Sequence, residues 1–348
     1  MIFKKNNEYK EYSLIDAFKV FFYLLIVVAG VSFFLQITIM IVGGNNATNL
    51  LESERVKIIT YLLTPLTFIT FYVFYNAKRK VKQTFAFGDG QKISFLPISV
   101  AMVLAIICIF MFTPFINLID YGFSEMGYIV DNTLPLQEKM SSSGLYLLLG
   151  IIIFALLPAI AEELIFRGII QKSLSTRLNG FSTVILTSIM FVLMHGSLQQ
   201  TVYQFIVGIL LSYVSYVGGS ILYSIILHFL NNALVVLFSC FDIVEYLSYD
   251  TTVYYNIFSM IFPVMIFLLG CVLVGILFWV LKYLRNKNFF RYVKKSKKKN
   301  AEDDNLQVEK VGLKNLWKSM SYNEKVFMIF GFVIVGVVWL IQTIDGFL

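Results

Sequence analysis

The chain has 348 residues, of which 58% are hydrophobic and only 14% are charged. Soluble domains carry about 25% charged residues, so this composition excludes an ordinary water-soluble domain and indicates a protein solvated largely by lipid. Much of the net charge of +7 sits in one basic stretch, from Lys282 to Lys299, directly after an apolar segment. Such a block normally sets the orientation of a membrane helix and contacts anionic lipid. We therefore expect a lipid bilayer as partner, and no nucleic acid.

A helix needs about 20 apolar residues to cross a bilayer, and the chain contains a series of such segments. The candidate spans are residues 20–42, 57–77, 95–119, 144–171, 181–198, 201–217, 220–240, 254–281 and 326–344. A very short segment joins the fifth and sixth of them, which leaves the number at eight or nine. The sequence thus predicts an all-α fold, a polytopic transmembrane helical bundle of about eight to nine spans.

The distribution of basic residues predicts the orientation in the cell membrane. Lysine and arginine are enriched in cytoplasmic loops. Basic residues occur at the N-terminus, after the second span, after the fourth and between Lys282 and Lys299, whereas the intervening loops are poor in them. The rule places the N-terminus in the cytoplasm, and nine alternating spans place the C-terminus outside.

Ionisable groups are few within the spans, and they form a cluster. Each costs about 2.5–3.5 kcal/mol in a membrane helix, so such groups normally face the protein interior and find partners there. The chain has only two histidines, and both fall within spans. The polar residues of the cluster are Glu162, Glu163, Arg167, His195, His228, Asn231 and Asn232.

Helical spacing separates these residues into two sets. Glu163 and Arg167 are four residues apart, with the acid first, which favours an ion pair. Glu162 is rotated by about 100° from Glu163 and can face another direction. His228 and Asn232 share a helix face because they too are four residues apart. Pro158 removes a backbone hydrogen bond just before the acids, so we expect a broken or kinked helix there.

Two imidazoles and a free carboxylate can activate water in either of two arrangements. In one, Glu162 and His195 hold and deprotonate the water, while His228 and Asn232 stabilise the oxyanion. In the other, Glu162, His195 and His228 bind one zinc ion that carries the water. The spacing does not choose between a site without a cofactor and a zinc site.

Three motifs in this region resemble those of a known family. Glu162-Glu163-Leu-Ile-Phe-Arg167 is similar to its EExxxR motif, Phe191-Val-Leu-Met-His195 to FxxxH, and His228-Phe-Leu-Asn-Asn232 to HxxxN. Together and in this order they resemble the CAAX-protease and bacteriocin-processing family, also called CPBP or Abi. The type II CAAX prenyl endopeptidases belong to this family of intramembrane proteases.

The resemblance implies an endopeptidase that hydrolyses a membrane-associated or leader-bearing peptide inside the bilayer. By the resemblance, residues matching Glu162 and His195 activate water, those matching His228 and Asn232 hold the oxyanion, and those matching Glu163 and Arg167 support the site. Both a metalloprotease and a metal-free, glutamate-dependent mechanism are proposed for the family. We favour the metal-free mechanism, because Asn232 suits an oxyanion donor and is a poor zinc ligand.

The resemblance covers about residues 144–240, which we interpret as the catalytic core. An N-terminal three-span region (1–143) precedes it, and a C-terminal two-span region (241–348) with a basic cytoplasmic linker (282–325) follows it. The C-terminal spans could recruit a membrane-protein partner. An alternative is a catalytically inert scaffold or regulator of the same fold, although a scaffold has no need to keep Glu162, His195 and His228 together. A proton-relay transporter predicts an internal repeat, which the sequence lacks.

Overall fold

The computed structural model describes residues 11–81, 95–130, 134–241, 257–286 and 310–348. Within these ranges the chain is a bundle of helices, and its extended pairing is limited to one isolated bridge, between Leu178 and Val311. Eight segments of the described chain are long and apolar enough to cross a membrane, as the composition predicts. They are Leu14–Leu51, Glu54–Arg79, Ile98–Glu125, Gly144–Ser175, Leu198–Gly218, Ile221–Cys240, Met260–Tyr283 and Tyr322–Asp345.

Several of these segments contain more than one helical element. The first consists of α1 (Leu14–Gly43), a short 3₁₀ turn and α2 (Ala47–Glu52), and the second is α3 (Glu54–Arg79). The third joins α5 (Phe95–Ile107), the π-helical turn η2 (Cys108–Phe112) and α6 (Thr113–Glu125). The remaining membrane-length helices outside Gly144–Ser175 are α12 (Leu198–Gly218), α13 (Ile221–Cys240), α15 (Ile257–Asn286) and α18 (Tyr322–Asp345).

The segment from Gly144 to Ser175 bends twice through wide π-helical turns. Its elements in chain order are α8 (Gly144–Gly150), η3 (Ile151–Leu156), α9 (Leu157–Ile165), η4 (Phe166–Ile170) and α10 (Gln171–Ser175). Pro158 lies in the first turn of α9, directly after η3. A proline cannot donate the backbone hydrogen bond of a regular α-helix, and a π-helical turn is one way to accommodate that loss. The regular α-helix is therefore interrupted next to Pro158, and the chain stays helical through the π-helical turn.

The fifth expected span, residues 181–198, is too short to be a full crossing. Its helix is α11 (Gly180–Leu193), whose 14 residues rise about 21 Å, against roughly 30 Å of hydrocarbon. Asn179 caps its start, and Gly196 adopts a φ of 65° just after its end. A left-handed residue stops a helix. By length α11 thus falls short of a full span, so the described chain has the lower of the two expected numbers of membrane-length segments.

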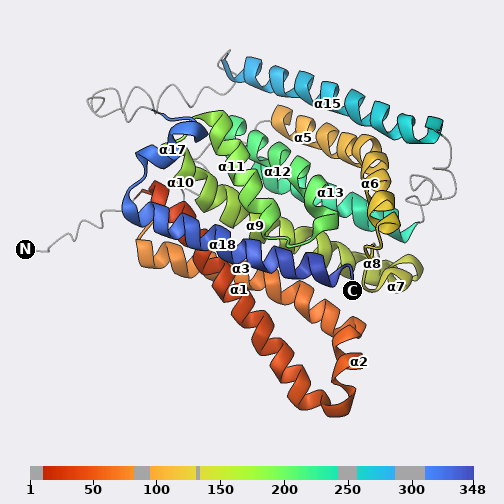
Figure 1. Ribbon diagram of the computed structural model, residues 1–348. Helices are drawn as coiled ribbons and strands as arrows, with labels where there is room; N and C mark the ends of the chain where they lie inside the picture. The colour runs from red at the N-terminus through yellow and green to blue at the C-terminus, as the bar shows by residue number, and fades with distance from the viewer. Residues whose placement is uncertain (1–10, 82–94, 131–133, 242–256, 287–309) are drawn as a thin grey trace, which may run out of the picture.

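The helices that carry the three sequence motifs lie at the centre of the bundle. Helix α9 packs between α3 and α13, and α11 forms a hairpin with α12 (Figure 1). Helix α18 packs along α1 on one side of this centre, and α15 packs against α6 and η2 on another. Two short helices, α7 (Gln137–Ser142) and α17 (Leu313–Ser319), complete the described structure. The central helices are thus shielded by the N-terminal and C-terminal ones.

Basic side chains gather at one end of the bundle. At this end, Arg79 Nη2 lies 2.6 Å from Asp16 Oδ2, which joins the end of α3 to the start of α1. Arg177 contacts Glu324 Oε2 at 3.1 Å and thereby joins the turn after α10 to the start of α18. Helices α1 and α18 run side by side, with Lys19 placed over the ring of Phe327. We call this end the basic end.

The basic end is defined by the described residues Lys78, Arg79, Lys80, Lys172, Arg177, Lys310, Lys314, Lys318 and Lys325. Residues 287–309 of the expected basic linker lie outside the described residues.

Candidate active site

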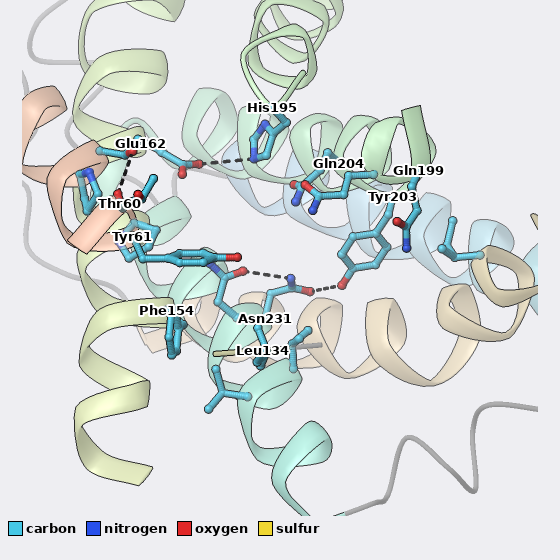
Figure 2. A pocket seen from close by; sticks show the side chains of 18 of the residues that line it. Thr60, Tyr61, Leu134, Phe154, Glu162, His195, Gln199, Tyr203, Gln204 and Asn231 are labelled. Atoms are coloured by element: carbon cyan, nitrogen blue, oxygen red, sulfur yellow. Dashed lines mark hydrogen bonds and ion pairs between the residues drawn. The ribbon is translucent and has the colours of Figure 1, made fainter. Parts of the chain in front are cut away.

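Three side chains from three helices converge on one point. Glu162 projects from α9, His228 from α13, and His195 from the turn that follows α11. Glu162 Oε2 lies 4.0 Å from His195 Nε2 and 3.9 Å from His228 Nε2. The side chain of Glu162 is 20% exposed and that of His195 is 19% exposed. The structure thus brings together three of the four residues that the sequence singled out as reactive. Two of them, Glu162 and His195, are partly exposed and are labelled in Figure 2.

Glu163 faces away from Glu162 and is bound from two sides. Its Oε1 atom lies 2.6 Å from Arg167 Nη1 and 3.0 Å from His228 Nδ1. The side chains of Glu163 and Arg167 have no exposed surface. Arg167 also donates from Nη2 to the Gly208 carbonyl at 3.1 Å, and its guanidinium lies over the ring of Phe191. The ion pair predicted from spacing is present, and it has the additional role of holding His228.

The partners of the two imidazoles determine where their protons lie. His195 Nδ1 is 3.0 Å from the Phe191 carbonyl, and His228 Nδ1 is 3.0 Å from the Glu163 carboxylate. Both partners can only accept hydrogen bonds, so we assign an N–H to each Nδ1. In a neutral ring the remaining nitrogen, Nε2, is then an acceptor. Both Nε2 atoms face Glu162. Three hydrogen-bond acceptors, the two Nε2 atoms and Glu162 Oε2, therefore converge, and a hydrogen-bond donor is needed between them.

A water molecule fits this arrangement. The distances of 3.9 and 4.0 Å exceed a hydrogen bond, and Glu162 Oε2 is buried without a hydrogen-bond partner. A polar separation of this size is commonly bridged by water, which supplies two donors to the converging acceptors. Such a water would lie at about 2.8 Å from the carboxylate and from an imidazole.

The same atoms fit a directly coordinated zinc ion less well. With bonds of about 2.0–2.1 Å, the ligands of a tetrahedral zinc ion lie roughly 3.4 Å apart. The two separations from Glu162 Oε2 are longer, at 4.0 and 3.9 Å. Among the described residues, no group of three His, Cys, Asp or Glu side chains is placed to hold a metal ion. The geometry therefore suits a water molecule held by the side chains better than a directly bound zinc ion.

Three of the four candidate reactive residues line a cavity of about 490 Å³. Glu162, His195 and Asn232 line it, together with Pro158. One part of its wall is apolar, with Leu134, Phe154, Val235 and Val236. Another part carries neutral amides and hydroxyls, from Thr60, Gln199, Gln200, Tyr203, Gln204 and Asn231. The carboxylate of Asp120 also lines the cavity, and it accepts a hydrogen bond from Gln199 Nε2 at 3.3 Å. The cavity is large enough for several residues of a peptide, and Figure 2 shows these side chains around it.

Asn232 is oriented by a short chain of hydrogen bonds. The hydroxyl of Tyr203 donates to Asn231 Oδ1 at 2.8 Å, and Asn231 Nδ2 donates to Asn232 Oδ1 at 3.4 Å (Figure 2). With its oxygen engaged as an acceptor, the amide of Asn232 keeps Nδ2 as its donor atom. An N–H donor in the cavity is what an oxyanion requires.

Tyr203 and the glutamines of α12 were not among the site residues predicted from the sequence. A signal for them exists in the spacing, because Gln199 and Tyr203 are four residues apart, as are Gln200 and Gln204. The two residues of each pair therefore share one face of α12, and the faces of the two pairs are adjacent. Neutral amides cost less in a membrane helix than charges, which is why they did not stand out beside the glutamates and histidines.

The region that contains these motifs matches the model of a known protein family. Residues 144–234 match the family model described as Type II CAAX prenyl endopeptidase Rce1-like. This segment is an Rce1-like domain. Neither the search of curated proteins nor the search of solved structures found a match to the chain.

The Rce1-like domain contains all the residues on which the resemblance was based. It extends from the start of α8 into α13, and thus includes Glu162, Glu163, Arg167, His195 and both residues of the HxxxN motif. The recognition of a CPBP-type family from three short motifs is confirmed. The chain is a multi-pass membrane protein that carries a domain of the CAAX-type intramembrane protease family.

Proposed function

We propose that the chain is an intramembrane endopeptidase that hydrolyses a peptide bond of a membrane-associated or leader-bearing peptide. The observation that carries the proposal is the convergence of Glu162 Oε2 with the Nε2 atoms of His195 and His228 at 4.0 and 3.9 Å. These atoms adjoin a cavity with room for a peptide. Supported by the Rce1-like domain, this arrangement favours peptide-bond cleavage over a purely structural role.

In the proposed reaction, Glu162 and His195 accept a proton from the water between them. The water oxygen attacks the carbonyl carbon of the substrate, and the carbonyl oxygen becomes an oxyanion. Asn232 Nδ2–H and a protonated His228 donate hydrogen bonds to that oxyanion. The proton taken from water then passes to the amide nitrogen, the C–N bond breaks, and a carboxyl and an amine leave.

The proposal is tested with Glu162→Gln and His195→Ala. Both variants should lower the cleavage rate by at least about 100-fold, because each removes a group that accepts the water proton. The substrate is found by proteomics of a deletion strain, as a peptide that remains unprocessed and is processed again when the wild-type gene returns. Glu125→Gln is the matched control, since Glu125 is exposed and does not line the cavity. Wild-type processing in both site variants would refute the proposal.

A metal requirement is tested separately on the purified protein. We expect cleavage to survive a chelator and elemental analysis to find no stoichiometric zinc. One zinc ion per chain, lost together with activity in His228→Ala, would establish the zinc mechanism instead.

A further inference from the structure

The cavity beside Glu162 lies away from the basic end of the bundle. Two of its exposed lining residues are Thr60, near the start of α3, and Gln200, near the start of α12. Helix α3 reaches the basic end at its other terminus, where Arg79 binds Asp16. Helix α12 also reaches the basic end with its C-terminus, because Tyr216 near that terminus lies against Gly180 at the start of α11. Both exposed residues thus mark the opposite end.

The turn that carries His195 also lies towards this opposite end. Gly196 packs so closely on Gln342 that an added Cβ would be 1.8 Å from the Gln342 Oε1 atom. Gln342 is 20 residues beyond Tyr322, the first residue of α18, which corresponds to about 30 Å along the helix. Since Glu324 fixes the start of α18 at the basic end, the His195 turn is most of a membrane thickness away from it.

The lining of the cavity indicates what it can hold. The described lining residues include two carboxylates, Asp120 and Glu162, and no lysine or arginine, so a carboxylate or phosphate of a substrate would find acidic groups and no basic side chain there. The amide side chains of Gln199, Gln200 and Gln204 can both donate and accept, which matches the N–H and C=O groups of an extended backbone. Phe154 and Val236 provide apolar surface for uncharged side chains.

We propose that the cavity receives an extended stretch of a peptide chain without acidic side chains, presented on the extracytoplasmic side of the membrane. The proposal rests on the endopeptidase function above and on the preference of basic residues for the cytoplasmic side, which places the basic end inside the cell. Because no cation is available for a terminal carboxylate, the cleaved bond lies within the substrate chain and not at its C-terminus.

The side from which the cavity opens is tested by cysteine labelling, which needs no activity. The background is Cys271→Ser, because Cys271 is the exposed one of the three cysteines. Gln200→Cys places a thiol at the cavity, and Lys314→Cys places one at the basic end, on an exposed residue of α17. A membrane-impermeant maleimide should label Gln200→Cys on intact cells, and label Lys314→Cys only after permeabilisation.

Three labelling results would overturn the proposed side of entry. They are labelling of the two variants from the same side, labelling in the reverse order, and failure of Gln200→Cys to react even after permeabilisation. Thr60→Cys repeats the test from a second helix, so a defect in one variant does not decide the outcome.

The nature of the substrate is tested with internally quenched peptides added outside intact spheroplasts. A peptide with an uncharged core should be cleaved by wild-type cells, and at least ten times more slowly when two aspartates replace core residues. Cells with Glu162→Gln should cleave neither. Equal rates for both peptides, or cleavage only after permeabilisation, would overturn the inference. Absence of cleavage from either side, with labelling as expected, would instead refute the endopeptidase function.

Discussion

Arg167 is a buried cation whose charge is balanced within its own helix. Its guanidinium binds Glu163 at 2.6 Å and the Gly208 carbonyl at 3.1 Å, and neither charged side chain has exposed surface. Removing one member of a buried pair leaves the other charge uncompensated, which costs about 3–5 kcal/mol. Exposed pairs are worth only about 0–1 kcal/mol. At the scale of residues, stability therefore depends on the inner pair far more than on surface pairs.

We expect Arg167→Met to lower the free energy of unfolding in detergent by about 3–5 kcal/mol. The matched control is Lys139→Met, which breaks the pair between Lys139 and Glu54. Both of these side chains are 52% exposed, so this change should leave stability nearly unaltered. Thermal unfolding of both proteins in the same micelles measures the difference. Arg167→Lys provides a milder variant if the methionine protein does not fold. Similar losses for Arg167→Met and Lys139→Met would contradict the prediction.

At the scale of elements, the turn between α11 and α12 depends on one glycine. Gly196 has a φ of 65°, a conformation that residues other than glycine rarely adopt, and it lies against Gln342 of α18. The adjacent residue is His195, whose ring is held by the Phe191 carbonyl. The backbone of this turn therefore positions a reactive group.

Gly196→Ala should destabilise the protein by about 1–2 kcal/mol and reduce cleavage more than this loss alone explains. The reason is that the new methyl group strains the backbone and collides with Gln342, which displaces the turn. Gly30→Ala is the control, because an added Cβ there meets nothing within 4 Å. Adding Gln342→Ala to Gly196→Ala should recover part of the loss by removing the collision and leaving the strain. A Gly196→Ala protein with wild-type stability and activity would show that the turn tolerates a side chain.

The central helices of the whole molecule are enclosed by α1 and α18, which come from opposite ends of the chain. These two helices meet at Gly331, where an added Cβ would lie 3.0 Å from the ring of Phe21. Further along α18, Gln342 supports the His195 turn. The docking of the last helix on the first thus also supports the active site, which lies between them in sequence.

Gly331→Val should force α1 and α18 apart and cost about 1–3 kcal/mol, as overpacking generally does. Gly336→Val on the same helix should have little effect, because a Cβ at Gly336 meets nothing within 4 Å. Unfolding temperature and cleavage rate, measured for both variants in one detergent, test the prediction. An equal response of the two variants would mean that the contact with Phe21 does not hold these helices together.

Local spacing was enough to predict the helical fold and the polar residues that converge in the structure. The four-residue intervals and the proline at 158 are properties of a single helix, so they can be read without tertiary information. The length of α11 could not be predicted in this way, because its end depends on the left-handed conformation of Gly196 in a turn packed on α18. The bond from Glu163 to His228 joins residues 65 positions apart, and no periodicity reports such a contact.

The pair formed by Glu163 and Arg167 has a consequence for the order in which the protein is made. The helix that contains them is synthesised before α12 and α13, which supply the Gly208 carbonyl and His228. Two lone charges entering lipid would each cost about 2.5–3.5 kcal/mol. Because the two charges are four residues apart, the nascent helix can neutralise them itself before its later partners exist. The spacing that marks the motif therefore also makes the helix easier for the translocation machinery to release into the bilayer.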